Sequence, residues 1–502
     1  MRRVAFFLAI VLSLSPGVSA KTKSKKIRGY VTNIVSTTTF EIEDYRITRD
    51  LTLVLDFEKG DSEESIDFRP EDIRIGTEVQ IKGDYDDETG ELQAKSIKVF
   101  LEEHKKVKRT ALLEHSPLLE REGDGWVGTF FADGQRIRVQ PSTKVVFKPN
   151  RSEKKALKEK EKKERKRKKE RKEEQESEEG EEDEDEYARP LQSLDEIGPN
   201  TFMTYVGFRH EDGSIDAIRL EFVRNELEKG EAKLWKKLTP KIKEPQYREG
   251  KPGQLKISKV GKFKLVPSEE AQEYVRQLGE SLIPPYQKSL PAGDPSKIPF
   301  QFYLVKGKTA NAFALPNGVI VIFSPMFEIL ENETQLASVL GHEIAHSIQE
   351  HTRRQRQYHK KKLMAMRIGG IFAATMGVPS VTDILNMIEG AIRNGYSRRL
   401  ENQSDRIGLE YLVAAGYDPR EAPRVWKMMA KKYGDRPTNF FWSSHNNHTT
   451  RRSYLMAELR NNYADLDYSE FQANNEEEFQ RIAELVKDAT AKKKKKKIKV
   501  KY

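Results

Sequence analysis

The sequence predicts an α+β protein in which two small β-rich modules precede a mainly helical half. Segments rich in β-branched and aromatic residues, separated by turn-forming residues, recur through residues 27–225. Apolar residues at helical spacing become prominent from residue 267 onward. The chain has 502 residues, 36% of them hydrophobic and 33% charged, so it can form real cores but also carries long solvated stretches.

The first 20 residues have the features of a secretory signal peptide. Arg2 and Arg3 form a charged start, residues 4–14 are an apolar run too short to span a bilayer comfortably, and Val18-Ser19-Ala20 supplies small residues for cleavage. We therefore expect a mature chain that begins near Lys21 and is periplasmic or secreted. An uncleaved anchor is the alternative.

Residues 21–105 and 106–228 are expected to form two related β-rich modules. The segment 75–83 matches 197–207, and 90–97 matches 213–220, which indicates an internal duplication. In both copies a strand that ends in glycine leads through an acidic turn to a second strand. The modules resemble small OB-like barrels. Such folds often bind polymers, but no motif here indicates a ligand, so a spacer or docking role is expected.

A charged insertion at 151–186 interrupts the second module. Its first part is dominated by Lys, Arg and Glu at spacings that favour a solvated helix, and residues 173–186 are almost entirely acidic. No aromatic residues interleave with the lysines, so no nucleic-acid partner is expected. A linker at 229–262 is predicted to follow the module.

The last segment, 466–502, is predicted to contain a helix and a polybasic tail. Lysine occupies positions 492–497, 499 and 501, and this tail explains much of the net charge of +10. Such a tail can contact anionic lipid headgroups or surface polymers, a contact that salt would weaken. It can equally remain a solvated extension.

The pentapeptide His342-Glu343-Ile344-Ala345-His346 is the strongest functional signal of the chain. The run 333–340 before it has helical character, and histidines four apart on a helix can both reach one metal ion. Glu343 is placed to take a proton from an attacking water. Because cysteine is absent, a metal site here must use His, Asp and Glu.

A third metal ligand is expected on a later helix, within residues 397–408. Glu401 and Asp405 are four residues apart and share one helical face. A carboxylate from Glu401 would complete a set of two histidines and one glutamate, which is typical of catalytic zinc with one position left open for water. Asp405 can accept a hydrogen bond from a ligand histidine and so fix its ring. One Zn²⁺ per chain is therefore expected.

A strand–turn–strand segment at 309–322 comes shortly before the zinc-binding helix. Pro316-Asn317-Gly318 marks the turn. A strand beside such a helix can hold an extended substrate by adding it to the sheet. The candidate substrate-binding residues are Asn311, Ala312, Phe313 and Ala314, with an ordinary core hairpin as the alternative.

Taken in order, these motifs make residues 263–465 resemble the gluzincin zinc metalloproteases of the HtpX, BepA and LoiP type, which also include Oma-type and CAAX prenyl proteases. The resemblance rests on Asn311–Pro316, on Gly341–His346 followed by His351, and on Ser397-Arg398 with Glu401 and Asp405. It implies a mainly helical domain with a small sheet, zinc on His342, His346 and Glu401, and Glu343 as general base. His351 lies five residues past His346, off the ligand face, and is interpreted as structural.

A last motif of the family is incomplete in this chain. The family carries Ser/Thr-His-Pro ahead of an arginine and a leucine, whereas here Ser444-His445-Asn446 precedes Arg451 and Leu455. By resemblance, His445 would stabilise the oxyanion of the reaction or cap the metal in a latent state. A solvated loop histidine is the alternative.

The predicted function is that of an exported zinc-dependent endopeptidase acting on protein or peptide substrates. By the same resemblance, its role would be the processing or quality control of envelope proteins. The alternative is a latched or inactive protease fold that serves as a chaperone-like or surface-binding module.

Overall fold

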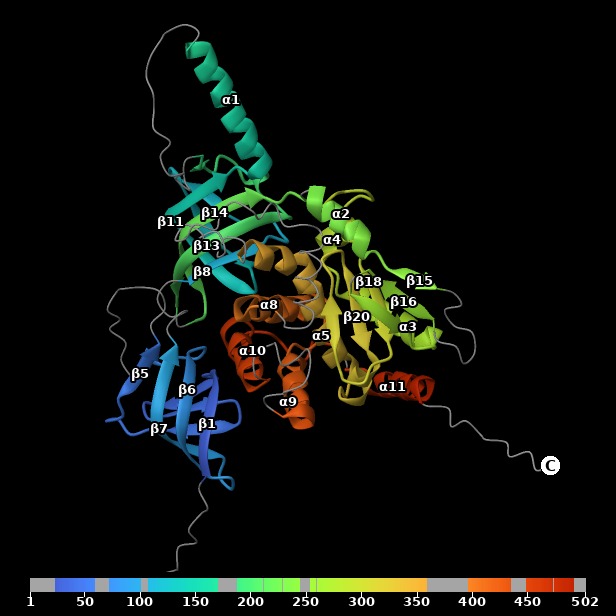
Figure 1. The fold of residues 1–502 in the computed structure, drawn as a ribbon. Coiled ribbons are helices and arrows are strands. Elements are labelled where there is room, and N and C mark those ends of the chain that lie inside the picture. The colour runs from blue at the N-terminus through green and yellow to red at the C-terminus, as the bar shows by residue number, and fades with distance from the viewer. Residues whose placement is uncertain are drawn as a thin grey trace, which may run out of the picture.

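The computed structural model describes residues 23–58, 72–100, 107–169, 187–210, 212–227, 229–243, 253–258, 260–358, 396–434, 448–472 and 474–491. Their architecture confirms the predicted α+β class, with two β-modules packed beside a mainly helical domain (Figure 1). The expected signal peptide, the acidic run 173–186 and the Lys-rich tail lie outside the described residues. Within the described ranges, every helix is too short or too polar to cross a bilayer.

The two modules are seven-stranded sheets whose six main strands follow one shared order, while the seventh strand pairs differently in each. The first has the order β1-β6-β7-β4-β3-β2, with β5 on β7, and the second has the order β8-β13-β14-β11-β10-β9, with β12 on β11. The first comprises β1 (Lys23–Tyr30), β2 (Asn33–Ser36), β3 (Thr39–Ile42), β4 (Tyr45–Thr48), β5 (Leu55–Glu58), β6 (Glu78–Tyr85) and β7 (Glu91–Phe100). The second comprises β8 (Val107–Leu112), β9 (Glu120–Glu122), β10 (Gly125–Ala132), β11 (Gln135–Lys148), β12 (Arg189–Pro190), β13 (Thr201–Arg209) and β14 (Ile215–Arg224).

A bulge at the same place in each module supports the duplication. The register of β6 with β7 shifts at Gly83, and that of β13 with β14 shifts at Gly207. A Cβ on Gly83 would lie 2.0 Å from the Gln93 carbonyl oxygen, and one on Gly207 would lie 2.2 Å from that of Asp216. Only glycine allows so close an approach of the two backbones.

The first part of the charged insertion forms helix α1 (Arg151–Lys169), which projects from the second module (Figure 1). Its described side chains are mostly exposed, and Lys155 and Glu159 pair one turn apart at 3.9 Å. A helix that is polar all round is the structure expected of a solvated charge run.

The segment 229–262 is more than a connection between domains. It forms α2 (Lys229–Leu238), β15 (Lys241–Lys243) and β16 (Gln254–Ile257), and β17 (Gly261–Lys264) completes a three-stranded sheet. Leu234, Leu238, Leu255 and Ile257 pack in one core with Phe313 and Leu315. Because these apolar residues are widely spaced among lysines, their shared burial is hard to recognise in the sequence.

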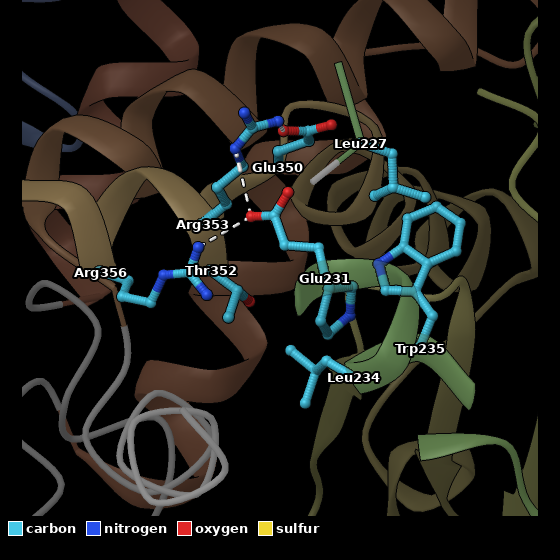
Figure 2. Close-up of a pocket in the computed structure, with 9 residues that line it drawn as sticks. Leu227, Glu231, Leu234, Trp235, Glu350, Thr352, Arg353 and Arg356 are labelled. Carbon is cyan, nitrogen blue, oxygen red and sulfur yellow. Dashed lines mark hydrogen bonds and ion pairs between the residues drawn. The ribbon is translucent and has the colours of Figure 1, made fainter. Parts of the chain in front are cut away.

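Helix α2 also borders a cavity that is closed on another side by residues 350–356 (Figure 2). Its Glu231 carboxylate pairs with Arg353 at 3.2 Å and with Arg356 at 2.9 Å, which balances a buried charge. The cavity holds none of the predicted site residues. It is lined by Leu227, Glu231, Leu234, Trp235, Pro316, Glu350, Thr352, Arg353 and Arg356.

The helical domain encloses one large core around a three-stranded sheet with the order β18-β20-β19. Phe479 on the last helix stacks on Phe327 at 5.3 Å, so this helix belongs to the same core. The elements are α3 (Glu269–Ser281), α4 (Pro285–Ser289), β18 (Gln301–Val305), β19 (Ala312–Ala314), β20 (Val319–Phe323), α5 (Glu333–Ile348), α8 (Arg398–Ala414), α9 (Glu421–Tyr433), α10 (His448–Asn462) and α11 (Glu476–Thr490).

Helix α5 passes through the middle of this domain. Asn332 caps its first turn by accepting the Gln335 backbone N–H at 2.9 Å, and nearly every side chain of the helix is buried. Its partner α8 approaches closely where two glycines face each other. A Cβ on Gly341 would lie 3.3 Å from the Gly408 carbonyl oxygen, and this contact brings His342 near the residues of α8.

Candidate metal centre

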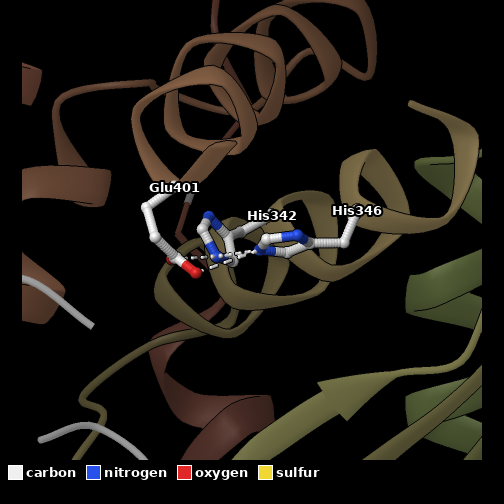
Figure 3. Close-up of side chains that lie close together, drawn as sticks. All are labelled: His342, His346 and Glu401. Carbon is white, nitrogen blue, oxygen red and sulfur yellow. Dashed lines mark hydrogen bonds and ion pairs between the residues drawn. The ribbon is translucent and has the colours of Figure 1, made fainter. Parts of the chain in front are cut away.

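Helices α5 and α8 bring three ligand-type side chains to one point (Figure 3). The Nε2 atoms of His342 and His346 lie 3.0 Å apart. One Glu401 carboxylate oxygen is 3.4 Å from His342 Nε2, and the other is 3.8 Å from His346 Nε2. All three side chains are buried, and one ligand atom from each lies within 4.8 Å of the others.

This donor set fits zinc. Two imidazole nitrogens and one carboxylate form a borderline-soft set that zinc accepts in catalytic sites, where it keeps one position open. Two ring nitrogens that face each other also repel unless a proton or a cation lies between them. The geometry therefore brings His342, His346 and Glu401 together in a cluster that could hold a metal ion.

Asp405 and Arg451 hold His342 from behind. Asp405 Oδ1 lies 3.0 Å from His342 Nδ1, as expected for an acceptor that orients a ligand ring. Arg451, on α10, is fully buried and donates from Nε to Asp405 Oδ2 at 2.9 Å. Its guanidinium lies 3.7 Å from the centre of the Trp426 ring. Arg451 stood in the family motif without a role, and only the fold reveals its contact with Asp405.

The charges of this group shift two pKa values. Burial and the Arg451 charge lower the pKa of His342, but hydrogen bonds to Asp405 and Glu401 outweigh them and raise it to about 9. Burial also disfavours ionisation of Asp405, yet the Arg451 charge and the His342 hydrogen bond prevail and lower the pKa of Asp405. Asp405 is thus held as a carboxylate.

Glu343 lies at the same site, between the metal ligands and the sheet. Burial is the main influence on its carboxyl group and raises the pKa of Glu343 to about 7, although the His342 charge works in the opposite direction. The Ala314 backbone N–H donates a hydrogen bond to this carboxylate. A carboxylate with a pKa near neutrality suits a general base.

The predicted substrate-binding strand has outward backbone groups along its edge and one side chain in the core. Among the described strands β19 pairs with β20 alone, so β19 lies at the edge of its sheet. The backbones of Asn311 and Leu315 bond to β20, which turns the N–H and C=O groups of Ala312 and Ala314 outward. The Phe313 side chain points into the core, toward Phe263 and Phe323.

His346 has two neighbours that the sequence does not reveal. Tyr396 stacks on its ring at 4.2 Å, and His351 Nδ1 lies 2.8 Å from His346 Nδ1. Helical spacing places His351 off the ligand face, but α5 ends at Ile348 and Glu350 has a φ of +50°. This left-handed residue turns the chain and returns His351 to the ligand.

His445 lies outside the described residues. Nearby His448 begins α10, where its ring is buried and stacks on Trp426 at 5.6 Å.

Comparisons with known proteins agree with this geometry. The model of peptidase family M48 matches residues 269–459. The beta-barrel assembly-enhancing protease of Yersinia pestis is 30% identical over 173 residues, 33% of this chain and 34% of that protein. The protein of that name in Escherichia coli strain K12 is 29% identical over the same length and shares. The mitochondrial metalloendopeptidase OMA1 of Saccharomyces cerevisiae is 33% identical over 135 residues, 26% of this chain and 38% of that protein.

These matches confirm the predicted resemblance to gluzincin metalloproteases. The chain spans only about a third of the length of the curated relatives it matches. The family match covers the helical domain from α3 to most of α10, and it includes neither α11 nor the two β-modules.

Proposed function

We infer that this chain, whose residues 269–459 form a peptidase family M48 domain, is a zinc-dependent endopeptidase that hydrolyses peptide bonds in protein substrates. The observation that carries the inference is the buried cluster of His342, His346 and Glu401, with the Glu343 carboxylate beside it. A set of two histidines and one glutamate with an adjacent carboxylate base is suited to metal-assisted hydrolysis.

The residues of the chain have separable roles in this reaction. Bound zinc would supply a Lewis acid that polarises the scissile carbonyl and acidifies water. Glu343 takes the proton of the attacking water and passes it to the leaving amine. Asp405, held as a carboxylate by Arg451, keeps the His342 ring in the orientation that ligation requires.

The edge of β19 is the proposed binding place for an extended substrate. The outward N–H and C=O groups of Ala312 and Ala314 can pair with a peptide backbone. Because the Ala314 N–H bonds to Glu343, a substrate that pairs there releases the Glu343 carboxylate as it binds. Substrate binding and freeing of the base would then be linked. Asn311 and Phe313 support this strand from its inner side.

The wider role is proposed from the chain start and the relatives. A signal-like segment at 1–20 favours export, with a periplasmic or secreted mature chain. Two relatives are named for enhancing beta-barrel assembly, which favours processing or quality control of envelope proteins. Other relatives are named as mitochondrial, so a localisation experiment would have to distinguish export from residence in another compartment. The Lys-rich tail would add contact with anionic lipid.

A latched protease is the second candidate. Ala312 and Ala314 are buried, and Glu343 is engaged with the backbone of this strand, as expected of a closed site. A histidine at 445 that caps the metal would keep such a site latent. In that state the chain would bind unfolded proteins without cleaving them.

One experiment separates these candidates. The mature chain and its Glu343→Gln variant are assayed for bound zinc and for cleavage of an unfolded protein. A matched control is Glu333→Gln, which changes another buried carboxylate of α5. The protease predicts zinc in all three proteins and cleavage by wild type and Glu333→Gln only. Zinc in all three without cleavage favours the latch, and a His445→Ala variant that gains activity would establish it.

A further inference from the structure

We propose that Asp133 of the second β-module acts with Gln403 and His351 to position the metal ligand His346. The second module then helps to position a ligand of the metal centre and is more than a spacer. The inference rests on the proposed zinc site and adds to it the residues that set the protonation of one ligand.

Four buried side chains form a continuous row of hydrogen bonds. Gln403 Nε2 donates to Asp133 Oδ1 at 2.6 Å. On its other side Gln403 Oε1 lies 3.0 Å from His351 Nε2, and His351 Nδ1 lies 2.8 Å from His346 Nδ1. The row therefore begins at the β10–β11 turn and ends on the far nitrogen of a metal ligand.

The neighbours of Gln403 fix which atoms donate. Arg354 Nη1 points at Gln403 Oε1 from 2.6 Å, and an arginine can only donate, so this atom is the amide oxygen. Gln403 Nε2 meets two acceptors, the Asp133 carboxylate and the Thr110 carbonyl oxygen. Since the Gln403 oxygen can only accept, His351 must carry its proton on Nε2.

The proton position of His351 determines that of the metal ligand His346. With its proton on Nε2, a neutral His351 has a lone pair on Nδ1 and accepts the Nδ1–H of His346. The lone pair of His346 is then on Nε2, the atom that faces His342 and Glu401. This is the form that binds a metal. Without the row, either nitrogen of His346 can hold the proton.

The second module is held firmly enough to act in this way. Asp133 also accepts from Arg406 at 2.8 Å and from the Tyr205 hydroxyl at 2.7 Å. Arg406 and Gln403 lie on α8, the helix that carries Glu401. At the end of α5, Gln349 bonds to both backbone groups of Leu112 on β8, at 2.7 and 3.1 Å. A buried polar network with every member paired is rigid.

The test measures zinc affinity by competition with a chelator, using the full mature chain. Loss of an oriented partner of a ligand histidine typically lowers metal affinity 10–100-fold. We expect about that loss in His351→Ala and in Gln403→Leu, with partial recovery in His351→Gln, whose amide can still bond. The matched control is Gln135→Leu, which breaks the 2.8 Å bond to Glu458 across the same module interface. Its zinc affinity should stay within about threefold of wild type.

A second readout reports the proton directly. In ¹⁵N-histidine spectra of the zinc-loaded wild type, His346 should be protonated on Nδ1 and His351 on Nε2. If His351→Ala does not fold, these wild-type spectra still test the proposed tautomers. The positioning role would be overturned if the two histidines had the opposite tautomers, or if zinc affinity were unchanged in His351→Ala and Gln403→Leu. It would also be overturned if Gln135→Leu lost as much zinc affinity as these two variants. A wild type that binds no zinc would instead overturn the proposed function, and this inference with it.

Discussion

Arg451 and Asp405 form a buried ion pair directly behind the candidate metal ligand His342. Arg451 donates from Nε to Asp405 Oδ2 at 2.9 Å, and Asp405 Oδ1 in turn lies 3.0 Å from His342 Nδ1. Both charges are shielded from water and compensate each other, and Arg451 also lies 3.4 Å from a Glu401 carboxylate oxygen. The pair joins α10 to α8 and connects the packing of both helices to the metal centre.

Replacing Arg451 with methionine should damage both stability and metal binding. The change removes the buried arginine partner of the Asp405 carboxylate, and breaking a buried pair in this way typically costs about 3–5 kcal/mol of unfolding free energy. Asp405 is then no longer held in place beside the His342 ring, so zinc affinity should fall. Urea unfolding and chelator competition measure the two effects.

The neighbouring Arg452 provides the control for this variant. Arg452 pairs with Glu43 and with the exposed Asp44 on the first module. Because the Glu43 side chain is buried and loses its arginine partner, Arg452→Met should also lower stability, but it should leave zinc affinity unchanged. Equal losses of zinc affinity in the two variants would contradict the role given to Arg451.

Glu114, at the interface of the second module with α8, should make stability depend on pH. Burial raises the pKa of Glu114 to about 7, against weaker opposing hydrogen bonds from Tyr411 and Gln349. The facing Glu410 is half-buried, and desolvation together with the nearby Glu114 charge raises its pKa. The protonated acids favour the folded state, so their stabilisation is complete below about pH 4.5 and is lost as the pH rises through 7.

The measurement is the unfolding free energy at pH 5, 6, 7 and 8. Wild type should lose on the order of a few kcal/mol over this range, and Glu114→Gln should lose less because its side chain never ionises. Glu120→Gln, on exposed β9, serves as the control and should follow wild type. A wild type whose stability rises from pH 5 to 8 would contradict the assignment.

Gly207→Ala tests the bulge that the two modules share. The new Cβ would lie 2.2 Å from the Asp216 carbonyl oxygen, so β13 and β14 must move apart. Overpacking of this kind costs about 1–3 kcal/mol, which thermal unfolding of the full chain can detect. In Gly198→Ala the added Cβ meets the Ser116 hydroxyl at 3.4 Å, and stability should barely change. A stable Gly207→Ala variant would show that this backbone contact is dispensable.

Local spacing predicted much of the site. Residues four apart on a helix share a face whatever the rest of the fold does, so His342 with His346 and Glu401 with Asp405 could be paired from sequence. The turn signal between two strands predicted the hairpin that contains β19, and the analogy with other metallopeptidases indicated β19 as the edge strand. Glycines at 83 and 207 supported the repeat because a bulge needs them at that position.

Contacts between distant segments could not be predicted in this way. Asp133 and Gln403 are 270 residues apart, and no periodicity relates a turn of a β-module to a helix in another domain. Arg451 reaches Asp405 only because α10 packs beside α8. The contact of His351 with His346 was missed for a different reason: helical spacing was extended past Glu350, where a positive φ turns the chain.

We propose that one zinc ion held by His342, His346 and Glu401 makes this chain an endopeptidase. The most direct test of this proposal follows cleavage of an unfolded protein by the mature chain as purified, after chelation, and after one equivalent of zinc is restored. We expect the purified chain to be active, the chelated chain to be inactive, and activity to return at one zinc per chain. Cleavage that persists without metal, or a zinc-loaded chain that cleaves nothing, would contradict it.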